Sequence, residues 1–483
     1  MSELARSVAT LRPRARALGL FEGAASVHVA CAPGRLDLMG GIADYSGSLV
    51  LQLPLDVDTV VLAAPRGDRL VRVVSEHVGV EPTAAAASPR AHAVDLTAFE
   101  ACRTQGYGPL RAELHGAGAD WFGYVAGILA VLAREHGADL RTGVDVLVSS
   151  RVPEGKGVSS SASVEVAAAA ALCAALGLRL GDGGGAPFVD PAACRALALA
   201  CQRVENHVVG AACGVMDQMA VASGHRGQLL RLLCQPAEVE GYVPLPPGLA
   251  VWGIDSGVRH AVSGSDYTSV RVGAFMGWRI VADLLGVEVR ASASGVEFEH
   301  PEFGSYLANV PPSQWRALRA RVPETLGGAE FLARYGGTND PVARVDPART
   351  YAVRQPTAHP IEEHERVRAF AALLAQAPPL ARAPSPEVGA RLGSLMFRSH
   401  ASYTACGLGC AATDVLVDAV RAAGSSIGVY GAKITGGGSG GTVAVLGRND
   451  AGEAVRSIAG DRLVLSVAAG DGAPVLRQGE VPW

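Results

Sequence analysis

Residues 144–176 form the segment that most restricts the possible folds of this chain. Residues 144–148 are apolar and rich in Val, which predicts a strand, whereas residues 159–176 are rich in Ala and predict a helix. A short loop containing two glycines separates them. Strand, glycine loop and helix in this order indicate a fold that mixes strands with helices.

The loop at 153–163 has the composition of an anion-binding site. Gly155 and Gly157 allow backbone N–H groups to converge on an anion, and the serines that follow place hydroxyls at the positive end of the helix dipole. The spacing matches neither a Walker loop nor a dinucleotide-binding motif. A serine-capped helix after a tight turn therefore remains the alternative to a triphosphate site.

Further strands and helices are predicted along the whole chain. Strands are expected at 27–30, 59–63, 71–74, 227–233, 249–254, 428–433 and 442–446. Helices are expected near the N terminus and at 121–134, 191–209, 270–285 and 415–423, with a Pro-rich linker at 376–386. We therefore predict a two-domain α+β chain with domains at 1–225 and 226–483.

Composition restricts the class of partner. The chain of 483 residues is 49% hydrophobic and 18% charged, with a net charge of −4 and no cluster of basic residues. This balance argues against nucleic acid and anionic membranes, and favours a small molecule. The apolar run at 166–176 is too short to span a bilayer. We expect a cytoplasmic protein, and the sequence leaves monomer and dimer open.

Residues 32–47 combine conformational restriction with opposite charges. Pro33 fixes one backbone torsion, and Arg35 and Asp44 supply charge within a glycine-broken segment that follows an apolar run. The pattern predicts a loop that carries polar groups off a buried strand. A surface turn with an incidental ion pair is the alternative.

Two carboxylates frame the segment 205–218. We expect Glu205 late on the helix predicted at 191–209, and Asp217 in the glycine-broken loop after it. A carboxylate beside a phosphate site can hold Mg²⁺, and a second one can position or deprotonate a hydroxyl nucleophile. A solvated glutamate on a helix surface is the alternative for Glu205.

Residues 434–442 contain five glycines between two predicted strands. So many glycines cost chain entropy unless the backbone must pass close to another group. A flexible linker is the alternative, although linkers do not usually interrupt a hairpin of apolar strands.

These glycine-containing motifs, in this order, resemble the GHMP small-molecule kinases, and specifically the galactokinase branch. Four short features narrow the resemblance: AspTyr at 44–45, MetAspGln at 216–218, ArgHis at 259–260 followed by SerAspTyr at 265–267, and SerHis at 399–400. The resemblance covers about residues 21–446. It implies two α+β domains with the active site in the cleft between them, and ATP-dependent phosphorylation of a sugar at the anomeric hydroxyl.

The resemblance also implies roles for individual residues. Asp217 would be the catalytic carboxylate, with Arg35 stabilising charge near the transferred phosphoryl group. The sugar would contact Gly41, Ile42, Asp44, Gly214 and Tyr267. The ATP phosphates would contact Gly155, Gly157, Ser159, Ser160, Ser161 and Ala162, with Gly436, Gly437 and Gly438 closing the site. Ser161 and Glu205 would be the Mg²⁺ ligands, with Ser160 as second choice for the serine.

Two positions depart from the galactokinase pattern. Galactokinases place a Glu–His pair, which binds the C6 hydroxymethyl group of the sugar, where this chain has Gly41 and Ile42. Neither side chain here can bond to a C6 hydroxyl, whereas Asp44 is retained. L-Arabinopyranose matches galactose around the ring and lacks C6. Residues 32–48 and 354–362 also resemble the L-arabinokinases, whose plant members carry an additional N-terminal domain.

Other functions stay open at this point. A galactokinase or a uronic-acid 1-kinase could build its C6 pocket from other residues, and a cationic side chain near Ile42 would favour the uronate. A non-catalytic sugar sensor is disfavoured because the serine loop, Glu205 and Asp217 are all present. A mevalonate-type isoprenoid kinase would leave the sugar-contact pattern unexplained. His359 and Glu362 have no assigned role, and we favour a structural one.

Overall fold

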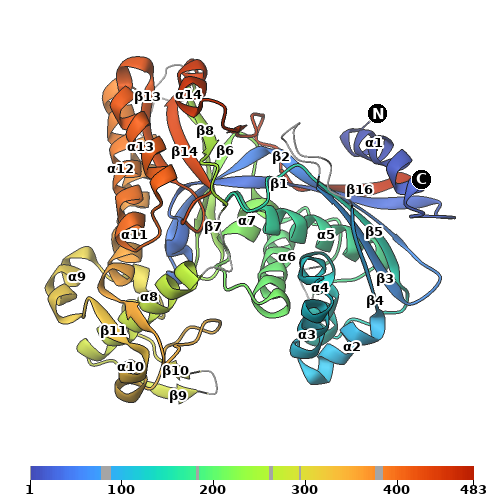
Figure 1. Ribbon diagram of the computed structural model, residues 1–483, viewed down its shortest axis with the longest axis horizontal. Coiled ribbons are helices and arrows are strands. Elements are labelled where there is room, and N and C mark those ends of the chain that lie inside the picture. The colour runs from blue at the N-terminus through green and yellow to red at the C-terminus, as the bar shows by residue number, and fades with distance from the viewer. Residues whose placement is uncertain (1, 78–88, 181–183, 260–264, 293–294, 376–384) are drawn as a thin grey trace.

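The computed structural model describes residues 2–77, 89–180, 184–259, 265–292, 295–375 and 385–483 (Figure 1). Within these residues, the largest sheet has eight strands in the order β16-β1-β2-β5-β3-β4, with β6 paired to β2 and β7 to β6. The strands are β1 (Ser26–Met39), β2 (Leu49–Pro65), β3 (Leu70–His77), β4 (Arg90–Asp95), β5 (Val144–Ser150), β6 (Gln228–Leu233), β7 (Glu238–Pro244) and β16 (Arg477–Pro482). Neighbouring strands are antiparallel, apart from the parallel pair β3 and β5.

Helices cover both faces of this sheet, and the alternation of side chains along β1 explains how. Ala30 and Ala32 belong to the core beneath the larger helical layer, whereas Val29 and Cys31 belong to the core beneath α1 (Glu3–Ala17). The larger layer contains α2 (Leu96–Gln105), α3 (Gly108–Gly116), α4 (Asp120–Glu135), α5 (Ser160–Leu176), α6 (Pro191–Arg203), the π-helix η3 (Val204–Val209) and α7 (Met216–Ser223). Small residues on both β1 and α5 let this helix lie close to the sheet.

A second sheet has the strand order β13-β14-β8-β15. It lies beside the C-terminal end of β1 and the N-terminal end of β2 (Figure 1). Its strands are β8 (Leu249–Asp255), β13 (Val429–Ile434), β14 (Thr442–Arg448) and β15 (Val464–Ser466), and its neighbouring helices are α11 (Arg354–Ala375), α12 (Pro386–Ala405), α13 (Ala411–Ala423) and α14 (Gly452–Ala459). The 3₁₀ turn η6 (Ser425–Ile427) leads into β13. Leu36, Leu38 and Leu51 of the β1–β2 hairpin share one core with Val251 and Leu446 of this sheet.

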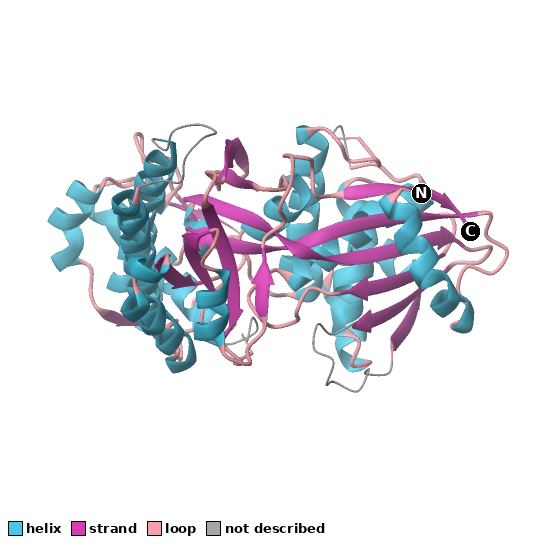
Figure 2. Cartoon of the chain, turned by 90° about the horizontal axis from the view of Figure 1, so that it is seen from above, coloured by secondary structure: helices cyan, strands magenta, loops and turns pink. Residues whose placement is uncertain are grey.

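A third group of short elements surrounds Trp278 and Trp315, which are fully buried. It contains α8 (Ser265–Leu284), α9 (Pro312–Leu318), α10 (Gly328–Tyr335), the 3₁₀ turns η4 (Leu307–Asn309) and η5 (Arg319–Arg321), and the strand pairs β9 (Arg290–Ser292) with β10 (Gly295–Glu297) and β11 (Thr325–Gly327) with β12 (Thr350–Ala352). Helix α8 packs on α11, so this group adjoins the second sheet. Figure 2 shows the long β1–β2 hairpin running between the two ends of the molecule.

The predicted α+β fold is confirmed. Each predicted strand and helix, from the strand at 27–30 to the strand at 442–446, overlaps an observed element. The predicted loop at 32–47 is wrong for its first half, because β1 continues to Met39 and the turn begins only at Gly40. The register shifts between Pro33 and Arg35, and both sides of this strand are buried. Most of the predicted linker, 376–384, lies outside the described residues.

The proposed domain division at residue 225 stays a prediction. Strands β6 and β7, which follow this position, and β16 at the C terminus all pair within the first sheet. The two long helices α11 and α12 were not predicted, and α11 contains Pro360, which reads as a helix breaker in the sequence. Among the described helices, none combines the length and apolarity needed to cross a membrane.

A fully buried ion pair fastens the two sheets together. Lys433 Nζ on β13 lies 2.5 Å from Asp37 Oδ2 on β1, and neither side chain is exposed. The other oxygen, Asp37 Oδ1, accepts hydrogen bonds from Gln52 Nε2 at 2.8 Å and from the backbone N–H of Gly41 at 3.0 Å. Thr435 Oγ1 accepts the backbone N–H of Asp37 at 2.8 Å. The pair therefore holds the β13–β14 hairpin against the turn that begins at Gly40.

Lys433→Met is expected to lower the free energy of unfolding by about 3–5 kcal/mol, because it leaves the Asp37 carboxylate buried without a cation. Urea denaturation of the purified protein measures this change. Arg421→Met is the control, since it removes a partner from the exposed pair Arg421–Asp418 and should change little. A Lys433→Met variant as stable as the control would contradict the anchoring role of this pair.

Candidate active site

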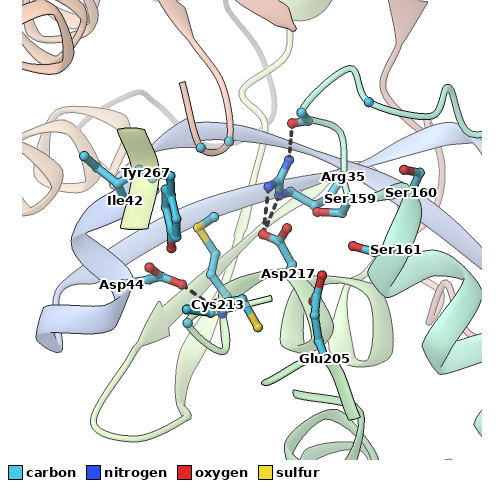
Figure 3. Close-up of a pocket in the computed structure, with 18 residues that line it drawn as sticks. Arg35, Ile42, Asp44, Ser159, Ser160, Ser161, Glu205, Cys213, Asp217 and Tyr267 are labelled. Atoms are coloured by element: carbon cyan, nitrogen blue, oxygen red, sulfur yellow. Dashed lines mark hydrogen bonds and ion pairs between the residues drawn. The ribbon is translucent and has the colours of Figure 1, made fainter. Parts of the chain in front are cut away.

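A cavity lies where the first sheet, the second sheet and α8 meet (Figure 3). Polar groups from several elements converge on it, as is usual for small-molecule sites. It is lined by Arg35, Gly41, Ile42, Asp44, Gly155, Gly157, Ser159, Ser160, Ser161, Glu205, Ala212, Cys213, Gly214, Met216, Asp217, Tyr267, Gly436 and Gly437. Two predicted site residues do not line it: Ala162 is buried in α5, and Gly438 packs against Leu408.

Arg35 and Asp217 meet at the centre of the cavity. Arg35 Nε and Nη2 donate to Asp217 Oδ1 at 3.0 and 2.7 Å, and Arg35 Nη1 donates to the carbonyl of Gly157 at 2.7 Å. The arginine side chain is 2% exposed and the aspartate 27%, so the carboxylate faces the cavity. The prediction that Asp217 lies in a loop is wrong, since Asp217 lies in the first turn of α7. The arginine therefore links the carboxylate to the glycine loop.

Asp44 defines one end of the cavity, together with Ile42 and Tyr267 (Figure 3). Asp44 lies in the 3₁₀ turn η1 (Gly41–Ser46), and its Oδ2 accepts the backbone N–H of Met216 at 3.4 Å. Burial, and secondly the nearby Asp217 carboxylate, raise the pKa of Asp44 to about 7. A Cβ at Gly214 would lie 1.8 Å from Asp44 Oδ2, so only glycine fits there. This end of the cavity therefore combines one carboxyl group with the hydrocarbon side chain of Ile42 and the phenol ring of Tyr267.

The opposite end of the cavity is formed by the loop before α5. Ser159 adopts the left-handed conformation (φ 60°, ψ 45°) and makes no side-chain cap, and its buried Oγ has no hydrogen-bond partner among the described residues. The alternative of a serine-capped helix is therefore wrong for Ser159. The uncapped N terminus of α5 and the hydroxyls of Ser160 and Ser161 face the cavity, as an anion requires.

The two glycine loops pack backbone against backbone. A Cβ at Gly436 would lie 2.6 Å from the carbonyl oxygen of Gly157, and one at Gly441 would lie 2.7 Å from that of Lys156. Thr442 Oγ1 donates to the same Lys156 carbonyl at 2.9 Å. This close approach explains the glycine content of residues 434–442 and rejects the alternative of a flexible linker.

The metal-ligand candidates lie in a buried group of carboxylates. Gln218 Nε2 donates to Glu205 Oε2 at 2.7 Å and to Glu165 Oε2 at 3.0 Å. Burial and the neighbouring Asp217 raise the pKa of Glu205, and burial and Glu205 raise that of Glu165. Arg35 is the one cationic side chain among the described residues that line the cavity. An added cation near Glu205 and Ser161 would offset this excess of negative charge.

The described residues contain no cluster of three or more His, Cys, Asp or Glu side chains arranged for a metal. The protein could therefore supply only part of a coordination shell, and phosphate and water oxygens would complete it. Mg²⁺ typically binds in this way, through one or two carboxylates and the phosphates of a substrate. The residues present thus fit Mg²⁺ bound together with a nucleotide.

Sequence reasoning missed several residues near the site. Ala212, Cys213 and Met216 line the cavity, although they lie inside the recognised segment 205–218. Glu165 could have been found as the residue one helical turn after Ser161. His359 and Glu362, which had no assigned role, lie on α11 and do not line the cavity.

Comparisons with known families agree with this geometry. The sequence description of the GHMP kinase N-terminal domain matches residues 123–225, that of the GHMP kinase C-terminal domain matches residues 386–464, and the galactokinase galactose-binding signature matches residues 20–65. The crystal structure of Lactococcus lactis galactokinase complexed with galactose has a TM-score of 0.66 to this chain at 19% identity. It covers 96% of this chain and 98% of the galactokinase, which shows a common fold.

The chain belongs to the GHMP kinase family. A galactokinase of Chloroflexus aggregans is 31% identical over 88% of this chain and 85% of its own length, so the chain belongs to the galactokinase family. An L-arabinokinase of Arabidopsis thaliana is 42% identical over 93% of this chain. This chain spans 45% of the length of that L-arabinokinase.

Asp44→Asn is expected to stabilise the protein above pH 7 relative to wild type. The pKa of Asp44 is about 7 in the folded protein, raised from 3.8. Between these two pKa values, the unfolded chain has lost the proton that Asp44 keeps in the folded protein. The stability contributed by Asp44 therefore falls as the pH rises through this interval. The difference in Tm between variant and wild type should therefore grow from about pH 4 to about pH 7 and stay constant above that.

Thermal denaturation over this pH range measures the effect. Asp461→Asn, which changes an exposed carboxylate, is the control and should follow wild type at every pH. An Asp44→Asn variant no more stable than wild type at the alkaline end would show that Asp44 is not strained by burial.

Proposed function

We propose that this chain is an ATP-dependent sugar 1-kinase that phosphorylates the anomeric hydroxyl of L-arabinose to give L-arabinose 1-phosphate. L-Arabinose is favoured as the substrate by one end of the cavity, where Asp44 lies beside Gly41 and Ile42. We call this the sugar end. The similarity to an L-arabinokinase over most of this chain supports it.

Phosphoryl transfer requires positioning and charge neutralisation, and we assign these tasks to the central pair. Asp217 accepts the proton of the anomeric hydroxyl, the anomeric oxygen bonds to the γ-phosphorus, and the bond from that phosphorus to the bridging oxygen breaks to release ADP. Arg35 orients Asp217 through two hydrogen bonds and stabilises the charge that develops on the transferred group. The exposure of Asp217 to the cavity supports its contact with substrate.

The nucleotide is assigned to the opposite end of the cavity. The N–H groups of the loop at 155–161 and the serine hydroxyls would bind the phosphates of ATP, with Gly436 and Gly437 covering them. Mg²⁺ would be held by Ser161 and Glu205 together with phosphate oxygens and water, and when bound it neutralises phosphate charge. Gln218 fixes the orientation of Glu205 through its amide hydrogen bond.

The sugar end of the cavity favours a pentopyranose over its C6-bearing relatives. The family resemblance implies that residues 41 and 42 face C6, and here they are a glycine and a hydrocarbon. A uronate would need a cation near Ile42, whereas Arg35, the one cation among the described lining residues, is paired with Asp217. The neutral sugar without C6 is therefore the better match, and the galactokinase and uronic-acid 1-kinase alternatives are less well supported.

Asp217→Asn is expected to lower kcat by about 10² to 10⁴, because the amide cannot accept the hydroxyl proton. Steady-state ADP release with saturating ATP, Mg²⁺ and L-arabinose measures the loss. Asp120→Asn is the control, since Asp120 also lies in the first turn of a helix but is 56% exposed. Near-normal turnover of Asp217→Asn would exclude it as the catalytic carboxylate, and a wild type that binds sugar without releasing ADP would indicate a sensor.

A panel of L-arabinose, D-galactose and D-fucose tests the substrate. L-Arabinose should react fastest and D-galactose about 10²-fold more slowly, since an apolar wall discriminates only modestly against an added group. Product regiochemistry should place the phosphate on the anomeric oxygen. A preference for D-galactose would overturn the assignment.

Ile42→Val should raise the relative rate on D-galactose, because it removes one methylene from the wall of the cavity. Ile458→Val on α14, remote from the cavity, is the matched control and should leave the sugar preference unchanged.

A further inference from the structure

The space beside Gly41 is filled by a residue from a different part of the chain. A Cβ built at Gly41 would lie 1.5 Å from the hydroxyl oxygen of Tyr403 and 2.8 Å from its Cζ. Gly41 also has a φ of +43°, which disfavours other residues. Gly41 lines the cavity, so Tyr403 excludes any side chain at this point of the wall.

The Tyr403 hydroxyl connects two walls of the cavity. It accepts the backbone N–H of Ile42 at 2.9 Å and donates to the carbonyl oxygen of Gly436 at 3.0 Å. Ile42 belongs to the sugar end and Gly436 to the glycine hairpin of the second sheet. One hydroxyl therefore sets the separation between these two segments.

The ring of Tyr403 is held on several sides. The side chain is fully buried in a cluster with Ile42, Leu408 and Ile434. The Lys433 ammonium group lies 5.2 Å from the ring centroid. Burial raises the pKa of Tyr403 well above its ordinary value, so the hydroxyl keeps the proton that it donates to Gly436.

The segment 354–363 supports this arrangement from behind. The His359 ring packs edge-on against Tyr403, with centroids 5.2 Å apart, and His359 Nδ1 lies 2.7 Å from Ser402 Oγ. The fully buried carboxylate of Glu363 accepts the backbone N–H of Gly40 at 3.2 Å. These contacts give α11 a structural role in holding the turn that carries Gly41 and Ile42.

We infer that Tyr403 is a positioning residue that determines sugar specificity. Its hydroxyl occupies the space beside Gly41 and holds Ile42 in place as the wall that contacts the sugar. This inference rests on the proposed function, because it assumes that the sugar lies between Asp44 and Ile42. It predicts that positions 41 and 403 are matched, so that a side chain at 41 requires a smaller residue at 403.

Tyr403→Phe keeps the ring and removes both hydrogen bonds of the hydroxyl. The ratio of kcat/KM for L-arabinose to that for D-galactose should fall about tenfold, the scale of one or two net hydrogen bonds. Because Tyr403 does not contact the reacting atoms, kcat with L-arabinose should stay within about threefold of wild type. Calorimetry of L-arabinose and D-galactose binding without ATP should show the same reduction in the difference between the two sugars.

Tyr351→Phe is the matched control, because Tyr351 is also buried and its hydroxyl accepts the backbone N–H of Asp346 at 2.9 Å, remote from the cavity. It should lose similar stability and leave the sugar ratio unchanged. An unchanged ratio in Tyr403→Phe would overturn the inference. A wild type that prefers D-galactose would refute the L-arabinose assignment, while a ratio that still shifts in Tyr403→Phe would support the role of Tyr403. A wild type that binds neither sugar would overturn both.

A second pair of variants decides the question if Tyr403→Phe does not fold. Gly41→Ala should be strongly destabilised, because its Cβ would clash with the Tyr403 hydroxyl. The double variant Gly41→Ala with Tyr403→Leu should lose less stability than the sum of the two single losses, because leucine leaves this space empty. Gly23→Ala is the control, because Gly23 also has a positive φ (+75°) and a Cβ there meets no atom within 4 Å. A Gly41→Ala variant as stable as Gly23→Ala would overturn the inference.

Discussion

The buried contact between Lys433 and Asp37 is the interaction on which the arrangement of the site depends. It joins β13 to β1 at the point where one strand leads to the glycine hairpin and the other to the turn at Gly41. Burying two charges is costly unless each is fully bonded, and here both oxygens of Asp37 are used. The two walls of the cavity are therefore fixed relative to each other before any substrate is present.

Buried carboxyl groups gather in and behind the cavity, and the one cation among its described lining residues is already paired. Asp44, Glu165 and Glu205 all have raised pKa values because they are buried close to other carboxylates, and Arg35 is committed to Asp217. Such an arrangement lowers stability and is retained where a function requires it. A kinase site has this requirement, since the substrates bring hydroxyl donors to one end and a cation with phosphates to the other.

Sequence reasoning located the residues that stand in polar, glycine-broken segments, and the structure brings nearly all of them to one cavity. Arg35, Asp44 and Asp217 were identifiable because their types are unusual within those segments and match a family pattern. Lys433 and Tyr403 were not, because their partners Asp37 and Ile42 lie hundreds of positions away and their own surroundings read as an ordinary strand and helix. Likewise, the need for glycine at 214 follows only from the proximity of Asp44.

In the proposed site, selectivity against an added hydroxymethyl group cannot come from hydrogen bonds with the side chains at positions 41 and 42, because Gly41 and Ile42 offer no side-chain donor or acceptor. An apolar wall rejects a larger sugar only as far as it resists displacement, since a wall that yields accommodates the extra atoms. Resistance here comes from behind the wall: the Tyr403 hydroxyl fills the gap beside Gly41 and bonds to Ile42, and Lys433 and His359 hold the tyrosine ring. Under the proposed function, rigidity rather than polar recognition is the physical basis of sugar choice in this chain.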